Sequence, residues 1–161
     1  GMLLALAEKG KTVAGWIYDP LSGRLCSAHR TGGAWLNGER FNARTSGQEP
    51  PIAAVSLVFM DQTKREAMRQ HIAPNYSLVD IPRCAAEQYP RLVLGENDVS
   101  VFERTYAWDH AAGVLFLNEA GGKITRPDGT PYRADGGSYQ GLLGAASPAL
   151  WDELAVRMAG I

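Results

Sequence analysis

The chain has 161 residues, of which 45% are hydrophobic and 20% charged, and this composition excludes a disordered, collagen-like or coiled-coil protein. Its 16 basic residues are balanced by 17 acidic residues, so no excess of positive charge indicates binding to nucleic acid or to an anionic membrane. We expect a single domain over residues 1–161 with its own core, and a small molecule as its partner, without nucleic acid or membrane.

The two cysteines, Cys26 and Cys84, are far apart and belong to no CxxC motif. They therefore predict neither a zinc site nor a disulfide framework, and the expected location is the cytoplasm, where thiols stay reduced. The apolar run at residues 2–7 is too short to cross a bilayer and lacks the basic flank of a signal peptide.

Short apolar stretches separated by turn residues fill the first part of the chain, up to residue 41. The segment Thr12–Tyr18 is rich in β-branched and aromatic residues and predicts a strand. Asn37-Gly38 is typical of a type I′ hairpin, in which both central residues need a positive φ. Asp19-Pro20 predicts a type I turn. Residues 1–50 are therefore predicted to form an antiparallel meander.

Strands and helices alternate in residues 51–161. Strands are predicted at residues 53–59, near 77–81, near 99–103, at 123–125 and at 141–145. Helices are predicted after Asp61, near 84–94, at about 110–119 and after Ser147-Pro148, which supplies an N-cap serine and a proline in the first turn. Gly121-Gly122 ends the third of these helices. The pattern predicts an α/β fold with a mixed sheet.

Asp109 is the most informative candidate for chemistry, because it lies between a predicted strand and a predicted helix. One interpretation makes it a helix N-cap. The other places it in the crevice where open α/β folds bind ligands, with a helix N-terminus that favours phosphate and a carboxylate that suits Mg²⁺. For the adjacent His110 a surface or capping position is the more common one, and a side chain facing the pocket is the alternative.

Trp108-Asp109-x-Ala-Ala-Gly, followed by Glu-Ala-Gly-Gly at 119–122, resembles the second signature of the inositol monophosphatase family. The meander and its Gly-Ala-Trp-Leu-Asn-Gly segment at 33–38 extend the resemblance over nearly the whole chain. It implies an N-terminally truncated, layered α-β-α-β sandwich of the inositol monophosphatase and fructose-1,6-bisphosphatase type. It also implies that Asp109 is a ligand of Mg²⁺, with helix capping as a compatible second role. The implied activity is hydrolysis of inositol phosphate, or a similar polyol or sugar phosphate, by metal-activated water.

The resemblance also implies substrate-binding residues. Arg83, Cys84 and Ala85 fall where the family carries the Gly-Ser/Thr-Ala-Ala segment that lines its pocket. Arg83 could pair with a second anionic group of the substrate, or with Glu87. Glu103 lies near a family glutamate that accepts a hydrogen bond from a substrate hydroxyl, and the alternative is a solvated glutamate at a strand end.

Two family motifs with metal-binding carboxylates, Glu-Glu and Asp-Pro-x-Asp-Gly-Thr, do not occur in these residues. Asp19-Pro20 and Asp128-Gly129-Thr130 resemble parts of the second motif but are predicted to be turns. A single aspartate does not hold two Mg²⁺ ions close together. The alternative function is therefore an inactive, folded module that dimerises or binds anions, and an exposed apolar face on the meander predicts a homodimer.

Overall fold

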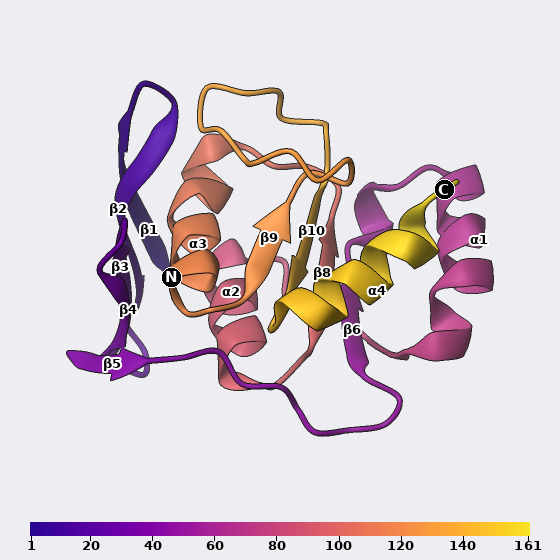
Figure 1. The fold of residues 1–161 in the computed structure, drawn as a ribbon, viewed down its shortest axis with the longest axis horizontal. Coiled ribbons are helices and arrows are strands. Elements are labelled where there is room, and N and C mark those ends of the chain that lie inside the picture. Colours follow the sequence, from indigo (N-terminus) through magenta and orange to yellow (C-terminus); the bar gives the residue numbers. More distant parts are fainter.

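Two β-sheets and two layers of helices alternate in the computed structural model, which describes residues 1–161 (Figure 1). The first sheet packs against α2 (Ala85–Leu94) and α3 (Ala107–Glu119), which lie on one face of the second sheet. The other face of the second sheet is covered by α1 (Gln62–His71) and α4 (Pro148–Met158). The predicted α-β-α-β layering is confirmed. None of the four α-helices is long and apolar enough to cross a membrane.

The first sheet is the predicted antiparallel meander, with strand order β1-β2-β3-β4-β5. Its strands are β1 (Met2–Glu8), β2 (Lys11–Asp19), β3 (Arg24–His29), β4 (Gly33–Leu36) and β5 (Glu39–Phe41). Asn37 and Gly38 connect β4 to β5 with φ values of 50° and 85°, which confirms the predicted hairpin. The Asp19 carboxylate accepts hydrogen bonds from the Leu21 amide and the Ser22 hydroxyl, which confirms a turn there.

The second sheet is mixed and has the strand order β7-β6-β8-β10-β9. Its strands are β6 (Ile52–Val55), β7 (Ser77–Val79), β8 (Val99–Phe102), β9 (Lys123–Thr125) and β10 (Leu142–Ala145). β6 runs parallel to β7 and β8, whereas β10 is antiparallel to β8 and β9. The carboxyl ends of β6 and β8 consequently lie at the same edge.

One predicted strand is too long. The expected strand over residues 53–59 ends at Val55, and Leu57–Phe59 forms the 3-10 helix η1. The Ser56 carbonyl accepts a hydrogen bond from the Phe59 amide, which closes a turn and takes the chain off the sheet. A continuous apolar run does not distinguish these two conformations by itself.

Side-chain caps define two of the helices as predicted. Asp61 accepts a hydrogen bond of 2.8 Å from the Lys64 amide at the start of α1, and Ser147 accepts one of 3.3 Å from the Leu150 amide at the start of α4. A second 3-10 helix, η2 (Ala73–Asn75), connects α1 to β7.

Helix α3 begins three residues earlier than predicted. The Tyr106 carbonyl accepts hydrogen bonds from the amides of Asp109 and His110, so Tyr106 is the N-cap residue and Ala107 is the first helical residue. Asp109 therefore lies inside the first turn, and the N-cap interpretation of this residue is wrong. The helix begins earlier because Ala107 and Trp108 are both compatible with helical structure, and neither is a glycine or a proline.

The core has two parts, one on each face of the second sheet. The larger part joins the first sheet to α2 and α3, and every residue of α3 from His110 to Leu117 is buried. At the end of α3 the Glu119 carboxylate accepts hydrogen bonds from the Thr31 and Gly33 amides, at 2.8 and 2.9 Å, and so attaches the helix to the β3–β4 turn. The spacing between the two sheets thus depends on a helix with no solvated face along most of its length.

Gly15 of β2 is the position of closest approach between the first sheet and α3. A Cβ atom added to Gly15 would lie 2.9 Å from the Ala112 Cα, which is backbone and cannot rotate away. Ala14, the adjacent residue, is paired with Leu6 and His29 on the opposite, outer face of the sheet. The two neighbouring positions therefore differ in packing although they share one strand.

We expect Gly15→Val to lower the free energy of unfolding by about 1–3 kcal/mol, because the side chain would push the sheet away from α3. Ala14→Val is the matched control and should change stability by less than about 0.5 kcal/mol. Urea unfolding followed by tryptophan fluorescence measures both. Equal effects of the two substitutions would contradict the close approach at Gly15.

Candidate functional site

A cavity of about 290 Å³ lies where the carboxyl ends of β6 and β8 meet the N-termini of α2 and α3. It is lined by four of the five residues predicted from the sequence: Arg83, Cys84, Ala85 and Asp109. The two segments that carry these residues follow β7 and β8, and β6 lies parallel between those strands, so their carboxyl ends meet at one edge. We refer to this cavity as the candidate site.

Neither helix N-terminus at the candidate site has a side-chain cap. Cys84 is the N-cap residue of α2 and Tyr106 that of α3, and neither side chain accepts a hydrogen bond from its helix. The first amide groups of a helix lack intrahelical partners, and they carry the positive end of the helix dipole. Two such ends beside one cavity favour an anion.

Two arginines give the candidate site a positive charge. Arg83 and Arg104 both line it, and neither forms an ion pair in the structure. The Arg104 guanidinium carbon lies 3.7 Å from the centroid of the Phe59 ring, which holds this side chain over the cavity wall. Arg104 was missed at the sequence level, because only the order of the second sheet places its loop beside Arg83.

The predicted alternative in which Arg83 pairs with Glu87 is wrong. Glu87 instead forms ion pairs with Arg24 and Arg91, the latter at 2.9 Å. Arg24 belongs to the first sheet, so Glu87 links α2 to that sheet. Arg83 is left exposed at the candidate site with its guanidinium available.

Glu103 does not line the candidate site. Its carboxylate lies 2.7 Å from the Lys64 ammonium group, so Glu103 is a partly exposed residue at the strand end that forms an ion pair. Lys64 is in the first turn of α1, which covers the other face of the second sheet from α2 and α3. The predicted hydrogen bond from Glu103 to a substrate hydroxyl stays a prediction.

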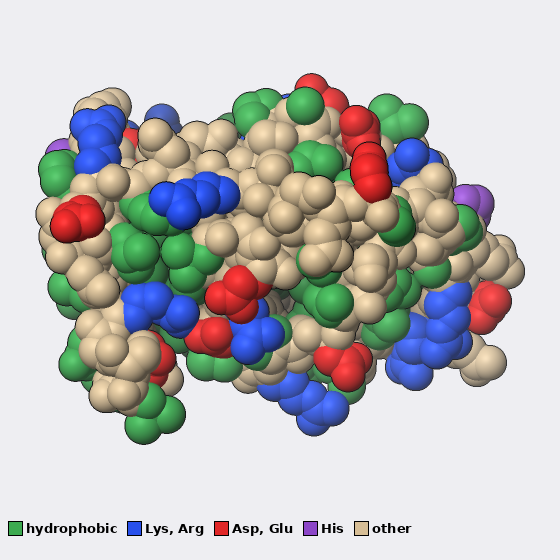
Figure 2. Space-filling model, turned by 90° about the horizontal axis from the view of Figure 1, so that it is seen from below, with side chains coloured by type: hydrophobic (Ala, Val, Ile, Leu, Met, Phe, Trp, Pro, Cys, Tyr) green, Lys and Arg blue, Asp and Glu red, His purple; other side chains and the backbone are tan.

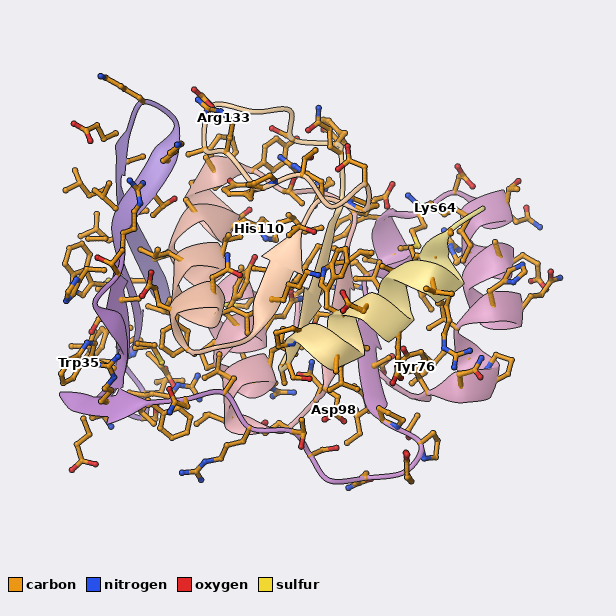
Figure 3. The ribbon with its side chains drawn as sticks, in the orientation of Figure 1. Trp35, Lys64, Tyr76, Asp98, His110 and Arg133 are labelled. Carbon is orange, nitrogen blue, oxygen red and sulfur yellow. The ribbon has the colours of Figure 1, made fainter.

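His110 is buried, with 5% of its surface exposed, and the surface interpretation is wrong. Its ring lines the candidate site and lies inside the molecule beside α3 (Figure 3). Its Nδ1 lies 2.8 Å from the Tyr89 hydroxyl. Burial lowers the pKa of His110 to about 4, so the ring is neutral at neutral pH. The sequence could have indicated this burial, because α3 has apolar residues on all of its faces and such helices are buried on every side.

Asp109 is the one carboxylate that lines the candidate site, and nowhere in residues 1–161 do three His, Cys, Asp or Glu residues form a group able to hold a metal ion. Mg²⁺ usually takes six oxygen ligands, commonly from more than one carboxylate together with water and phosphate. The two arginines beside Asp109 oppose a bare cation. The residues present therefore do not form a complete Mg²⁺ site.

The family model described as the inositol monophosphatase family matches residues 1–159. The chain belongs to the inositol monophosphatase family. It is 28% identical to an inositol-1-monophosphatase of Bacillus subtilis over 80% of the chain and 50% of that protein. It is 30% identical to an inositol-1-monophosphatase of Mesorhizobium japonicum over 84% of the chain and 52% of that protein.

A solved structure of an inositol monophosphatase from Zymomonas mobilis has the same fold, with a TM-score of 0.84 at 22% identity. The match covers 98% of this chain and 61% of that one. The chain thus spans about half the length of the curated relatives it matches. The chain therefore has the fold of the corresponding part of an inositol monophosphatase, as the sequence resemblance implied.

The two thiols of this family member differ in exposure. Cys84 is exposed at the candidate site, whereas Cys26 of β3 is buried in the core between the first sheet and the helices, and burial raises the pKa of Cys26 to about 11. We expect a thiol reagent such as DTNB to modify one cysteine of the native chain quickly and the second only after denaturation. In Cys84→Ser no fast reaction should remain. Fast modification of two thiols in the native chain would contradict the burial of Cys26.

Proposed function

We propose that this chain provides the substrate-binding part of a phosphate monoester hydrolase, acting on inositol phosphate or a similar small polyol or sugar phosphate. The observation that carries the proposal is the pairing of Arg83 and Arg104 with two uncapped helix N-termini around one cavity. Membership in the inositol monophosphatase family supports the choice of substrate class.

Phosphate is the anion that this chemistry suits best. Guanidinium groups form paired hydrogen bonds with phosphate oxygens, and neither arginine forms an ion pair in the structure, although Asp109 lines the same cavity. The neutral His110 adds no positive charge to the wall. The small residue Ala85 leaves room for the sugar or polyol beside the amide groups of α2.

Asp109 is proposed as a ligand of Mg²⁺, which is the metal that the family resemblance implies. Such an ion would supply the activated water for hydrolysis. Since Asp109 lacks a second carboxylate nearby, we assign the other ligands to residues outside this chain, from a further segment or a second molecule. Binding of the phosphate needs only the residues of this chain, and turnover needs more. The cytoplasm is proposed as the location, since both cysteines are free.

We expect inositol 1-phosphate to bind this chain in calorimetry and neutral inositol to bind at least tenfold more weakly, because the positive charge selects the phosphate. Arg83→Gln and Arg104→Gln should each weaken binding by about 3- to 30-fold. Arg69→Gln, on the exposed face of α1, is the control and should leave the affinity unchanged.

In a phosphate-release assay with Mg²⁺, the chain and its Asp109→Asn variant should be equally inactive. Equal affinity for inositol and its phosphate, or no effect of either arginine, would overturn the proposed substrate site. Mg²⁺-dependent turnover that Asp109→Asn abolishes would show that these 161 residues do complete the metal site.

A folded module that associates with itself is the second candidate function, and one surface favours it. The outer face of the first sheet, which points away from α3, carries five exposed apolar side chains: Met2, Leu4, Leu6, Trp16 and Leu25. Trp35 also lies on this side of the sheet (Figure 3). By contrast, acidic and basic side chains are scattered among hydrophobic ones on the face seen in Figure 2. An apolar patch of this kind is typical of an interface.

We expect the chain to form a homodimer through this outer face, with a mass in sedimentation equilibrium that rises with concentration. Leu4→Lys, in the middle of the patch, should weaken the dimer at least tenfold, because it buries an unpaired charge. The control is Val156→Lys on α4, which is 76% exposed and lies on the opposite side of the molecule. A monomer at all concentrations, or equal effects of both substitutions, would contradict this interface.

A further inference from the structure

A second, larger cavity of about 560 Å³ lies between the start of β2, the middle of α3 and the long loop that connects β9 to β10. It shares no lining residue with the candidate site. Figure 3 shows Arg133 in this part of the molecule, on the loop beside the β1–β2 turn. Cavities of this size commonly hold small-molecule ligands. None of the matched residues of the family signature and none of the predicted substrate residues lines this cavity, although α3 contributes residues to both cavities.

The charge of this cavity is one-sided. Four of its 13 lining residues are basic, namely Lys11, Arg30, Arg126 and Arg133, and none is acidic. Two carboxylates lie close by but outside the lining: Asp135 forms an ion pair with Arg133, and Asp128 accepts hydrogen bonds from Thr130. Lys11 and Arg30 form no ion pair. The cavity therefore has a surplus of positive charge on a protein whose net charge is −1.

Arg126 is the most unusual member of this group, because its charge is buried without a carboxylate partner. Only 4% of its surface is exposed. Its guanidinium donates hydrogen bonds to the Thr105 hydroxyl and to the carbonyl oxygens of Gly137 and Gly141, at 2.7 to 2.9 Å. These partners are neutral, and the nearby Asp128 carboxylate acts on the charge but forms no ion pair with the guanidinium. Buried charges are normally paired, so an anion in the cavity would supply the missing partner.

The rest of the wall suits an anion that is part of an organic molecule. Val114 and Leu115 of α3, together with Pro131 and the Tyr132 ring, give the cavity an apolar side. The Asn118 and Gln140 amides add polar groups that could bind hydroxyl or ring nitrogen atoms. We propose that this cavity binds a small organic phosphate with a flat apolar part, of the size of a nucleoside monophosphate, separately from the candidate site.

The test uses adenosine 5′-monophosphate as the charged probe and adenosine as its neutral counterpart, in calorimetry on the full chain. We expect the monophosphate to bind and the nucleoside to bind at least tenfold more weakly. A double variant, Lys11→Gln with Arg30→Gln, should weaken binding of the monophosphate at least tenfold. Both side chains are at the rim and outside the core, so the variant should unfold at the wild-type temperature. Raising the ionic strength should also weaken binding.

The Arg69→Gln variant, on the exposed face of α1, is the control and should leave binding of adenosine 5′-monophosphate unchanged. Arg83→Gln removes a cation from the candidate site and reports whether the probe binds there instead. Loss of binding in Arg83→Gln but not in the double variant would place the anion at the candidate site and overturn this inference. Absence of binding would overturn it as well. Neither outcome affects the proposed function, which rests on inositol 1-phosphate and on Arg83 and Arg104.

Discussion

The contact between α3 and the first sheet sets the arrangement of everything else in this molecule. The helix approaches β2 so closely that Gly15 has no room for a side chain opposite Ala112. On its other side Gly113 leaves room for the Tyr89 ring of α2. Because α3 is buried from His110 to Leu117, it is in close contact with its neighbours on every side, and the distances to them are fixed by packing. The run of small residues in the family signature therefore has a packing role in addition to any role in chemistry.

The same contact positions the charges of the candidate site. With α3 fixed against both sheets, its N-terminus lies at the edge where β6 and β8 end, beside the N-terminus of α2. Two hydrogen bonds at Thr105 fix the loop before α3. The Thr105 hydroxyl accepts one from the Arg126 guanidinium, and the Thr105 amide donates one to the Ser138 carbonyl. The two cavities are therefore linked through this loop: Arg126 lines one of them, and the loop to which it donates a hydrogen bond carries Arg104 of the other.

Much of the fold could be predicted from local signals. The hairpin at Asn37-Gly38 and the cap at Ser147 depend only on residues nearby in the sequence, and both were predicted correctly. The segment 53–59 was not, because an apolar run does not say where a chain leaves its sheet. The start of α3 was predicted three residues late, since Asp109 resembles an N-cap when its contacts are unknown.

The candidate site could be predicted only in part, for a different reason. Arg83, Cys84 and Asp109 were found because they lie in or near recognisable segments. Arg104 and the pairing of Glu103 with Lys64 depend on which strands are neighbours, which the sequence does not state. The second cavity was not predicted at all. Its cations come from β2, from the turn after β3 and from the loop after β9, and none of them belongs to a motif.

The order of the layers also has a consequence for how the chain folds during synthesis. All five strands of the first sheet are complete at Phe41, but the helix that covers their inner face begins at Ala107. At ribosomal speeds of about 5–20 residues per second, the meander waits for some seconds before α3 emerges. During this interval the inner face of the meander has no α3 to pack against. The first sheet therefore gains its packing against α3 only late, when the centre of the molecule is made.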